Sequence, residues 1–331
     1  MRDLAPEGMQ VHDEARMRVF VTGASGFVGR SVVARLRAEG HAAVALVRPN
    51  SLRPLAPADD LEIVSGDVRD AALVARAARG CDAAIHLAGI IRERGANTFE
   101  AVHVRGTENV VSACRSAGIR RLIHMSAHGA ALGAPAAYLR SKEAADSTVR
   151  ESGLDWTILR PAVIHGPRAD FVIAMARLVA RPGPVPLIGR GHQVLQPIWV
   201  EDVARLAVDA LGLDAAVGGT FEVAGPDLVG LHTFLRMLSR ILVGRRKMLL
   251  PIPTPVVRAA AWLGAKVLRS PPITPDELRM LLAAVPCDIG PMQRAFGFEP
   301  APLEPTLTAY ADELRAAAGI RGAEVVPRST S

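Results

Sequence analysis

The feature that most constrains this sequence is a glycine-rich turn between a short apolar run and a helical pattern. Residues 19–21 are apolar and suit a buried parallel strand. Gly23, Gly26 and Gly29 follow at spacings of three, and a helical pattern covers residues 28–39. Glycines let a pyrophosphate approach the backbone, and a helix N-terminus offers N–H groups and a positive dipole. The order strand, glycine turn, helix therefore predicts a phosphate site.

Apolar runs and helical patterns alternate after this turn. The runs cover residues 42–47, 61–65, 83–87, 121–125, 156–159 and 220–223, and the helical patterns include 71–79, 98–117 and 168–181. Short continuous apolar runs are typical of parallel strands, because crossover helices bury both faces of such a sheet. We expect an α/β fold: a Rossmann-type doubly wound parallel sheet with a smaller, mostly helical C-terminal lobe.

The composition favours a cytoplasmic α/β protein. Half of the 331 residues are hydrophobic and only 4% are aromatic. Cys81, Cys114 and Cys287 lie far apart with no Cys-x-x-Cys, which argues against a disulfide framework or a zinc site and fits a reducing compartment. The nine histidines show no metal-ligand spacing, so no metal is expected. The acidic N-terminus is not a signal peptide, and no apolar run is long enough to span a bilayer.

Tyr138 and Lys142 form a Tyr-x-x-x-Lys pair after the fifth apolar run. Residues four apart share one face of a helix. A lysine ammonium near a phenol lowers the pKa of the phenol, which can then act as a general acid or base toward a carbonyl or an alcohol. The alternative is an ordinary solvated helix face, although the chain has only two tyrosines.

The turn Thr-Gly-x-x-Gly-Phe-x-Gly resembles the fingerprint of extended and atypical short-chain dehydrogenases/reductases, whose glycine loop holds the pyrophosphate of NAD or NADP. In this family an acidic–apolar pair brackets the adenine, small residues end the fourth strand, and an Arg-Pro segment lies beside the nicotinamide. The resemblance implies cofactor contacts at Thr22, Gly23, Ser25, Gly26, Phe27, Val28, Gly29, Asp67, Val68, Leu87, Ala88, Gly89, Lys142, Pro161 and Val163. Asp67 has an alternative role as the cap of the helix that starts near Asp70.

The same resemblance implies that Tyr138 and Lys142 are the catalytic pair, with a hydroxyl residue at the end of the fifth strand as third member. Ser126 is the candidate, but the register of many extended members places this position on Ala127. His103 stands where the family usually has asparagine. An unidentified small-molecule substrate would lie between the two lobes, and the sequence does not indicate an oligomeric state.

Arg48 follows the second apolar run, where NAD-preferring sites have an acidic residue for the ribose hydroxyls. A guanidinium there favours a 2′-phosphate, so we expect NADP rather than NAD. The alternative is a solvated arginine at a strand end.

One branch of the family fits best. The stretches 86–95, 97–103, 124–127 and 153–161 are similar to the bacterial relatives of the nucleotide-binding accessory subunit of respiratory complex I, proteins often described as epimerase/dehydratase-like. This resemblance leaves two functions open. The first is an oxidoreductase or epimerase that uses Tyr138 and Lys142. The second is a non-catalytic NADPH-binding accessory protein of a membrane-associated assembly.

The resemblance also implies the domain boundaries. We expect a disordered extension over residues 1–16 and a Rossmann domain over 17–167, with a return segment at about 193–224. Residues 168–192 and 225–318 would form the substrate or partner lobe, with 225–318 built of helices, and 319–331 a disordered tail.

A basic segment lies within this lobe. No acidic residue occurs between Asp227 and Asp276, and the interval carries eight Lys and Arg residues. In a helix over 254–269, Arg258, Trp262, Lys266 and Arg269 share one face, and Val256, Ala260, Leu263 and Val267 share the opposite one. This pattern indicates either peripheral binding to the inner face of a membrane through residues 228–275 or a core-packed helix with a solvated basic face. Nucleic acid is not expected, because aromatic residues are scarce.

Overall fold

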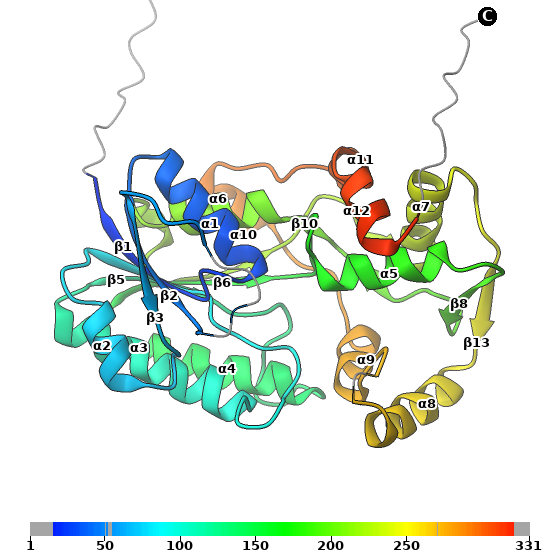
Figure 1. Cartoon of the computed structure of the whole chain (residues 1–331), viewed down its shortest axis with the longest axis horizontal. Coiled ribbons are helices and arrows are strands. Elements are labelled where there is room, and N and C mark those ends of the chain that lie inside the picture. The colour runs from blue at the N-terminus through cyan, green and yellow to red at the C-terminus, as the bar shows by residue number, and fades with distance from the viewer. Residues whose placement is uncertain (1–15, 50, 52–54, 270, 321–331) are drawn as a thin grey trace, which may run out of the picture.

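A computed structural model of the chain describes residues 16–49, 51, 55–269 and 271–320. At its centre is a seven-stranded sheet in the order β11-β6-β5-β4-β1-β2-β3, and all its pairings are parallel (Figure 1). The strands are β1 (Arg18–Thr22), β2 (Ala42–Val47), β3 (Leu61–Ser65), β4 (Ala83–His86), β5 (Arg121–Met125), β6 (Asp155–Pro161) and β11 (Gly219–Val223). The predicted fold class is confirmed.

The central strands are apolar on both sides because helices cover both faces of the sheet. In β1, Val19 and Val21 pack toward one layer and Phe20 packs toward the other, and all three are fully buried. Figure 1 shows one layer above the sheet and one below it. The upper helices are α1 (Phe27–Ala38), α6 (Val200–Asp209) and α10 (Gly290–Phe296), and the lower ones are α2 (Ala71–Ala77), α3 (Arg105–Ala117) and α4 (Ala137–Arg150).

The strand order reverses between β1 and β4, which are direct neighbours although two strands separate them in sequence. Crossovers leave these two strands in opposite directions, so a crevice opens beyond their carboxyl ends. The glycine turn follows β1, and residues 87–90 follow β4. The topology therefore brings two of the predicted cofactor-binding segments to one crevice.

A second lobe has its own apolar core. It is built from α5 (Asp170–Ala180), α7 (Leu231–Val243), α11 (Leu303–Ala309) and α12 (Ala311–Ala318). The expectation that residues 225–318 contain only helices is wrong. The strand β13 (Leu249–Ile252) pairs with β8 (Val185–Ile188), and β12 (Val229–Gly230) pairs with β9 (Val194–Leu195), because proline- and glycine-rich stretches at these places favour extended backbone.

Short elements connect the two lobes. The strands β7 (Ile164–His165) and β10 (Ile198–Trp199) pair in parallel. Within the main domain, the short helix η2 (Asp214–Ala216) precedes β11. The helix α10 returns to the main sheet, where the ring of Phe296 meets that of Phe221 of β11 edge-on. The predicted extension and tail lie outside the described residues except for residues 16, 319 and 320. Among the described helices, none is long and apolar enough to cross a membrane.

The helices α8 (Thr254–Val267) and α9 (Pro275–Leu282) hang below the second lobe in Figure 1, and α9 touches α4. Thr274 and Glu277 form a capping box at the start of α9. The Glu277 carboxylate also accepts two hydrogen bonds of 2.8 Å from Arg92. The Asp276 carboxylate accepts hydrogen bonds from the backbone N–H groups of Ala137 and Tyr138, at 2.9 and 3.1 Å. The C-terminal lobe therefore supplies the carboxylate at the N-terminus of α4.

His128 fastens residues 285–287 to the end of the sheet. Its Nδ1 is paired with the Glu222 carboxylate, and its Nε2 lies 2.9 Å from the Val285 carbonyl oxygen. Hydrogen bonds with Cys287 and Glu222 raise the pKa of His128 to about 10 against the opposing effect of burial. The imidazole is therefore charged at neutral pH and donates from both nitrogens.

We predict that the protein loses stability in alkaline solution as His128 loses its proton. The folded pKa is raised, so the contribution of His128 is complete below about pH 6.5 and is lost as the pH rises through about 10. Urea unfolding from pH 6 to pH 10 should show a decline of roughly 4 kcal/mol in the free energy of unfolding. The Glu222→Gln variant should show a smaller decline, because only the Cys287 interaction would still raise the pKa of His128, and an equal decline in both proteins would contradict the assignment.

Candidate cofactor cleft and active site

The glycine turn lies against the end of β4. Gly23 has a φ of +69°, and a Cβ on it would lie 2.8 Å from the backbone nitrogen of Ala88. A Cβ on Gly29 would lie 2.2 Å from the carbonyl oxygen of Gly23. Gly26 is the N-cap of α1, whose first turn carries no acidic residue. Glycines at these positions therefore form a cradle at a helix N-terminus, which fits a dinucleotide pyrophosphate.

A buried hydrogen-bond chain joins the turn to α3. The Thr22 hydroxyl lies 2.6 Å from Nδ1 of His86, and Nε2 of His86 lies 2.9 Å from the Thr107 hydroxyl. Thr107 in turn donates to the carbonyl of His103 at 2.5 Å. Burial and the charges of His124 and Lys142 lower the pKa of His86 well below its usual value. A neutral His86 that donates from Nε2 and accepts at Nδ1 satisfies every group in the chain.

His103 lies in a π-helical turn, Glu100–Val104, where the sequence predicted regular helix from residue 98 to 117. Its Nε2 accepts from the Ile90 N–H at 3.0 Å, and its Nδ1 lies 2.8 Å from the Ser141 hydroxyl, which donates to the carbonyl of Tyr138. Burial and the Lys142 charge lower the pKa of His103 to about 2, so the ring is neutral. His103 therefore ties the loop after β4 to the first turn of α4.

Tyr138 and Lys142 lie one turn apart on α4, as predicted. Nζ of Lys142 donates to the carbonyl of Met125 at 2.7 Å. A Cβ on Gly89 would lie 3.6 Å from this Nζ and 3.4 Å from Nε2 of His103. The Tyr138 ring meets the His103 ring edge-on, with centroids 5.6 Å apart. Gly89, His103 and the Tyr–Lys pair thus converge at the carboxyl ends of β4 and β5.

The electrostatics of the pair differ from the sequence expectation that Lys142 lowers the pKa of Tyr138. Burial, helped by the negative charge of Asp146, raises the pKa of Tyr138 to about 12. Burial lowers the pKa of Lys142 to about 8, although Asp146 acts in the opposite direction. Desolvation outweighs the attraction because the lysine ammonium is directed at the Met125 carbonyl.

Asp146 centres a buried network that sequence reasoning missed. Its carboxylate accepts from the Ser126 hydroxyl at 2.9 Å and from Arg160 at 2.7 Å, and Nε2 of His124 lies 3.3 Å away. Asp146 is fully buried. Burial acts to raise its pKa, but the interactions with His124, Ser126 and Arg160 lower it overall. The one available signal was the spacing of four residues that puts Asp146 on the helix face of Tyr138 and Lys142.

Ser126, the predicted third catalytic residue, is therefore committed to this network. Its side chain is 3% exposed and its hydroxyl proton is donated to Asp146. Ala127, at the alternative position, is also buried. The Ser126 hydroxyl therefore lies beneath α4, where it is hydrogen-bonded to Asp146.

Asp67 and Val68 follow β3, next to the end of β2. The Asp67 carboxylate pairs with Arg69 at 2.8 Å, and Asp70, not Asp67, caps α2 by accepting from the Leu73 N–H. Burial acts to raise the pKa of Asp67, but Arg69 and the positive charge of Arg48 lower it overall. Arg48 is exposed directly after β2 and therefore lies near Asp67. Val68 packs against Gly106 of α3, where a Cβ would come within 3.0 Å.

The segment after β6 is fixed on both sides. The carbonyl of Pro161 accepts from the His128 N–H at 2.9 Å, and that of Val163 accepts from the Ile198 N–H at 3.0 Å. The ring of Phe27 in the glycine turn reaches Gly166, where a Cβ would lie 2.9 Å from it. Leu87, Ser25 and Val28 are partly buried around the turn. The predicted nicotinamide segment therefore lies beside the glycine turn.

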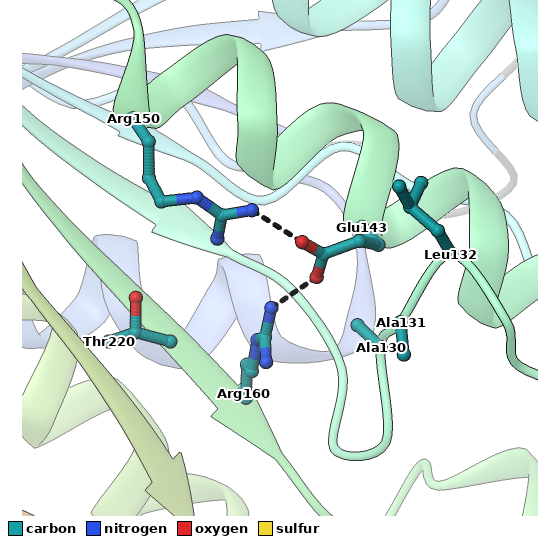
Figure 2. A pocket seen from close by; sticks show the side chains of 7 residues that line it. All are labelled: Ala130, Ala131, Leu132, Glu143, Arg150, Arg160 and Thr220. Atoms are coloured by element: carbon teal, nitrogen blue, oxygen red, sulfur yellow. Dashed lines mark hydrogen bonds and ion pairs between the residues drawn. The ribbon is translucent and has the colours of Figure 1, made fainter.

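A surface hollow of about 520 Å³ lies between α4, β6 and β11 (Figure 2). Glu143 of α4 pairs there with both Arg150 and Arg160. The other lining residues are Ala130, Ala131, Leu132 and Thr220. None of the predicted cofactor or catalytic residues lines it, and both of its arginines are already paired with carboxylates, so we do not assign the site to this hollow.

Among the described residues, His128, Glu222 and Cys287 form a group whose possible metal-ligand atoms lie within 4.8 Å of one another. No spacing along the chain indicates this group, because its three members come from distant segments. Both nitrogens of His128 are engaged, one with Glu222 and one with the Val285 carbonyl. We therefore interpret the group as a structural contact in which a charged His128 holds residues 285–287 against the sheet.

Comparison with known proteins identifies the class. Residues 23–212 match the NAD(P)H-binding family, and the chain belongs to that family. It is 32% identical over 195 residues to the ceramide reductase of Caulobacter vibrioides, covering 59% of this chain and 61% of the reductase. It is 31% identical over 264 residues to the UDP-glucose 4-epimerase of Mycolicibacterium smegmatis, covering 69% of this chain and 82% of the epimerase.

The predicted resemblance to complex I subunits is confirmed. The chain is 29% identical over 299 residues to mouse mitochondrial NADH dehydrogenase (ubiquinone) 1 alpha subcomplex subunit 9, covering 86% of this chain and 77% of the subunit. Other relatives are longer: the chain spans 28% of the length of an uncharacterised Mycobacterium tuberculosis protein to which it is 30% identical.

Solved structures share the fold. The UDP-glucose 4-epimerase of Thermotoga maritima, solved with UDP-glucose, has a TM-score of 0.71 at 19% identity, covering 91% of this chain and 99% of that chain. The Bordetella bronchiseptica enzyme WbmG, solved with NAD, has a TM-score of 0.70 at 18% identity, covering 94% and 97%. The nucleotide-binding fold is thus established.

We predict that Gly29→Ala removes dinucleotide binding and lowers the free energy of unfolding by roughly 1–3 kcal/mol. The added methyl group would collide with the Gly23 carbonyl inside the cradle. Titration with NADPH and thermal unfolding measure the two effects. Gly133→Ala is the matched control, because a Cβ there meets no atom within 4 Å. If Gly29→Ala binds NADPH as the wild type does, the glycine turn is not part of the cofactor site.

Proposed function

We propose that the protein is an NADP(H)-dependent oxidoreductase of the short-chain dehydrogenase type, with Tyr138 and Lys142 as its proton-transfer pair. The observation that supports this most is the convergence of Gly89, Lys142 and Tyr138 at the carboxyl ends of β4 and β5. These strand ends lie beside the glycine cradle at the topological switch point. The relatives named above include a reductase and an epimerase.

The residues fit a bound dinucleotide along the whole crevice. The cradle of Gly23, Gly26 and Gly29 would hold the pyrophosphate, and Asp67 and Val68 would flank the adenine. Leu87, Ala88 and Gly89 would line the middle, with Pro161 and Val163 at the nicotinamide end. A bound nicotinamide supplies or accepts the hydride in such a reaction. The chain itself binds, orients and moves the proton.

The proton would pass between the Tyr138 hydroxyl and the oxygen of a small-molecule carbonyl or alcohol. A phenol with a pKa of about 12 keeps its proton at neutral pH and suits the role of general acid. Lys142 would hold the nicotinamide ribose and offset the charge of the phenolate. The Ser126 hydroxyl donates to Asp146, so we assign Ser126 to orienting this network beneath α4.

We assign the cofactor as NADP on the position of Arg48. The side chain is exposed directly after β2 and close enough to Asp67 to lower the pKa of that carboxyl. A guanidinium there can pair with a 2′-phosphate, which NAD lacks.

We expect NADPH to bind more tightly than NADH, and Arg48→Ala to weaken NADPH binding by roughly tenfold or more while leaving NADH binding unchanged. Titration followed by nicotinamide fluorescence measures both constants. Arg79→Ala, which removes an exposed arginine from the turn after α2, is the control. Equal affinities for the two cofactors in the wild type would contradict the assignment.

A second candidate function is a non-catalytic NADPH-binding accessory protein. The commitment of Ser126 to Asp146 and the alanine at position 127 favour it, as does the similarity to the complex I subunit. In that case the nucleotide would only stabilise the fold.

Tyr138→Phe distinguishes the two functions. If the protein is an enzyme, turnover of any substrate found by screening carbonyl compounds and nucleoside-diphosphate sugars should fall by roughly 10²-fold or more, because the proton donor is lost. NADPH binding should stay within twofold, which also serves as the folding control. If Tyr138→Phe keeps wild-type turnover, Tyr138 is not the proton donor.

A further inference from the structure

The helix α8 leaves its apolar stripe in solvent. Val256, Leu263 and Val267 are 55%, 56% and 72% exposed. The helix packs instead through a narrower strip to one side of it, formed by Val257, Ala261 and Gly264, of which only Ala261 is buried. The sequence alternative of a core-packed helix is therefore wrong, because α8 rests on its small residues. Large apolar side chains exposed in one stripe indicate an interaction surface.

Basic residues occupy the other exposed face of α8. Arg258, Lys266 and Arg269 are exposed, as predicted for the basic face. Nζ of Lys266 lies 3.7 Å from the centre of the Trp262 ring, and Trp262 is 56% exposed. Together with the stripe these residues form what we call the α8 surface. A tryptophan among cationic side chains suits the boundary between lipid chains and headgroups.

The acidic residues that follow this segment are paired with other parts of the molecule. Asp276 accepts hydrogen bonds from the first backbone N–H groups of α4, and Glu277 pairs with Arg92. The interval from residue 228 to 275 has no acidic residue and eight basic ones. The positive charge of the α8 surface is therefore uncompensated within its own segment and favours an anionic partner.

Leu250 of β13 and Met248 add apolar exposure next to this segment, at 50% and 69%. In Figure 1, α8 is at the outer edge of the molecule, away from the main sheet and from α5 and α7. Its position leaves the helix free to lie flat on an extended surface.

We propose that the α8 surface docks on an anionic lipid bilayer. Val256, Leu263 and Val267 would enter the boundary of the acyl chains, and Arg258 and Lys266 would meet lipid phosphates. This inference is independent of catalysis. It commits to a lipid surface because uncompensated cationic charge beside an apolar stripe matches an anionic headgroup layer over hydrocarbon.

Co-sedimentation of the full chain with vesicles tests the proposal. We expect binding to vesicles of phosphatidylcholine with phosphatidylglycerol, and much weaker binding to phosphatidylcholine alone. Leu263→Ser/Val267→Ser should reduce the bound fraction at least several-fold. Arg258→Gln/Lys266→Gln should lower the partition coefficient by roughly tenfold or more.

Matched controls change equally exposed residues elsewhere. Ile91→Ser/Leu132→Ser removes apolar side chains that are 55% and 70% exposed, and Arg76→Gln/Arg79→Gln removes the same charge from α2. Both should bind vesicles as the wild type does. Thermal unfolding confirms that each variant is folded.

Three results would overturn the proposal. One is equal binding to neutral and anionic vesicles, and another is equal loss in the control variants. The third is a lack of vesicle binding together with a dimer that Leu263→Ser/Val267→Ser dissociates, which would assign the α8 surface to a second copy of the chain. None of these results depends on NADPH binding or turnover, so the proposal and the catalytic function fail separately.

Discussion

The contact between the glycine turn and the end of β4 is the constraint around which this protein is built. Gly23 approaches the backbone of residues 87–88 so closely that a single Cβ would collide with it. This approach is possible only because β1 and β4 are neighbours, which in turn requires the strand order to reverse between them. The crevice, the cradle and the placement of Gly89 all follow from that one arrangement.

Hydrogen bonds carry the constraint from the cradle to α4. The chain through His86 and Thr107 joins Thr22 to the carbonyl of His103, and His103 joins the loop after β4 to Ser141. The two threonines and two histidines are buried, so an unpaired member would cost roughly 1–3 kcal/mol. A neutral histidine with one donor and one acceptor nitrogen satisfies such a chain.

The C-terminal lobe is joined to the site through charge. Asp276 caps the helix that bears Tyr138, and Glu277 forms an ion pair with Arg92. His128 holds the segment around Val285 against the sheet. These links come from segments more than 90 residues apart in the chain. Through Asp276, the peripheral helix α9 is joined to the same helix that carries the proposed proton-transfer pair, and α8 packs on α9.

The sequence by itself determined the α/β fold, the position of the cradle and the shared helix face of Tyr138 and Lys142. These features depend on local patterns: apolar runs, glycine spacing and a helical repeat of nearly four residues. Only the tertiary structure decided that Ser126 donates to Asp146 and that α8 leaves its apolar stripe in solvent. It also decided that the pKa of Tyr138 is raised by burial, where the sequence predicted that Lys142 would lower it. Each of these depends on which distant side chain lies opposite and how much water is excluded, and periodicity along the chain carries no information about either.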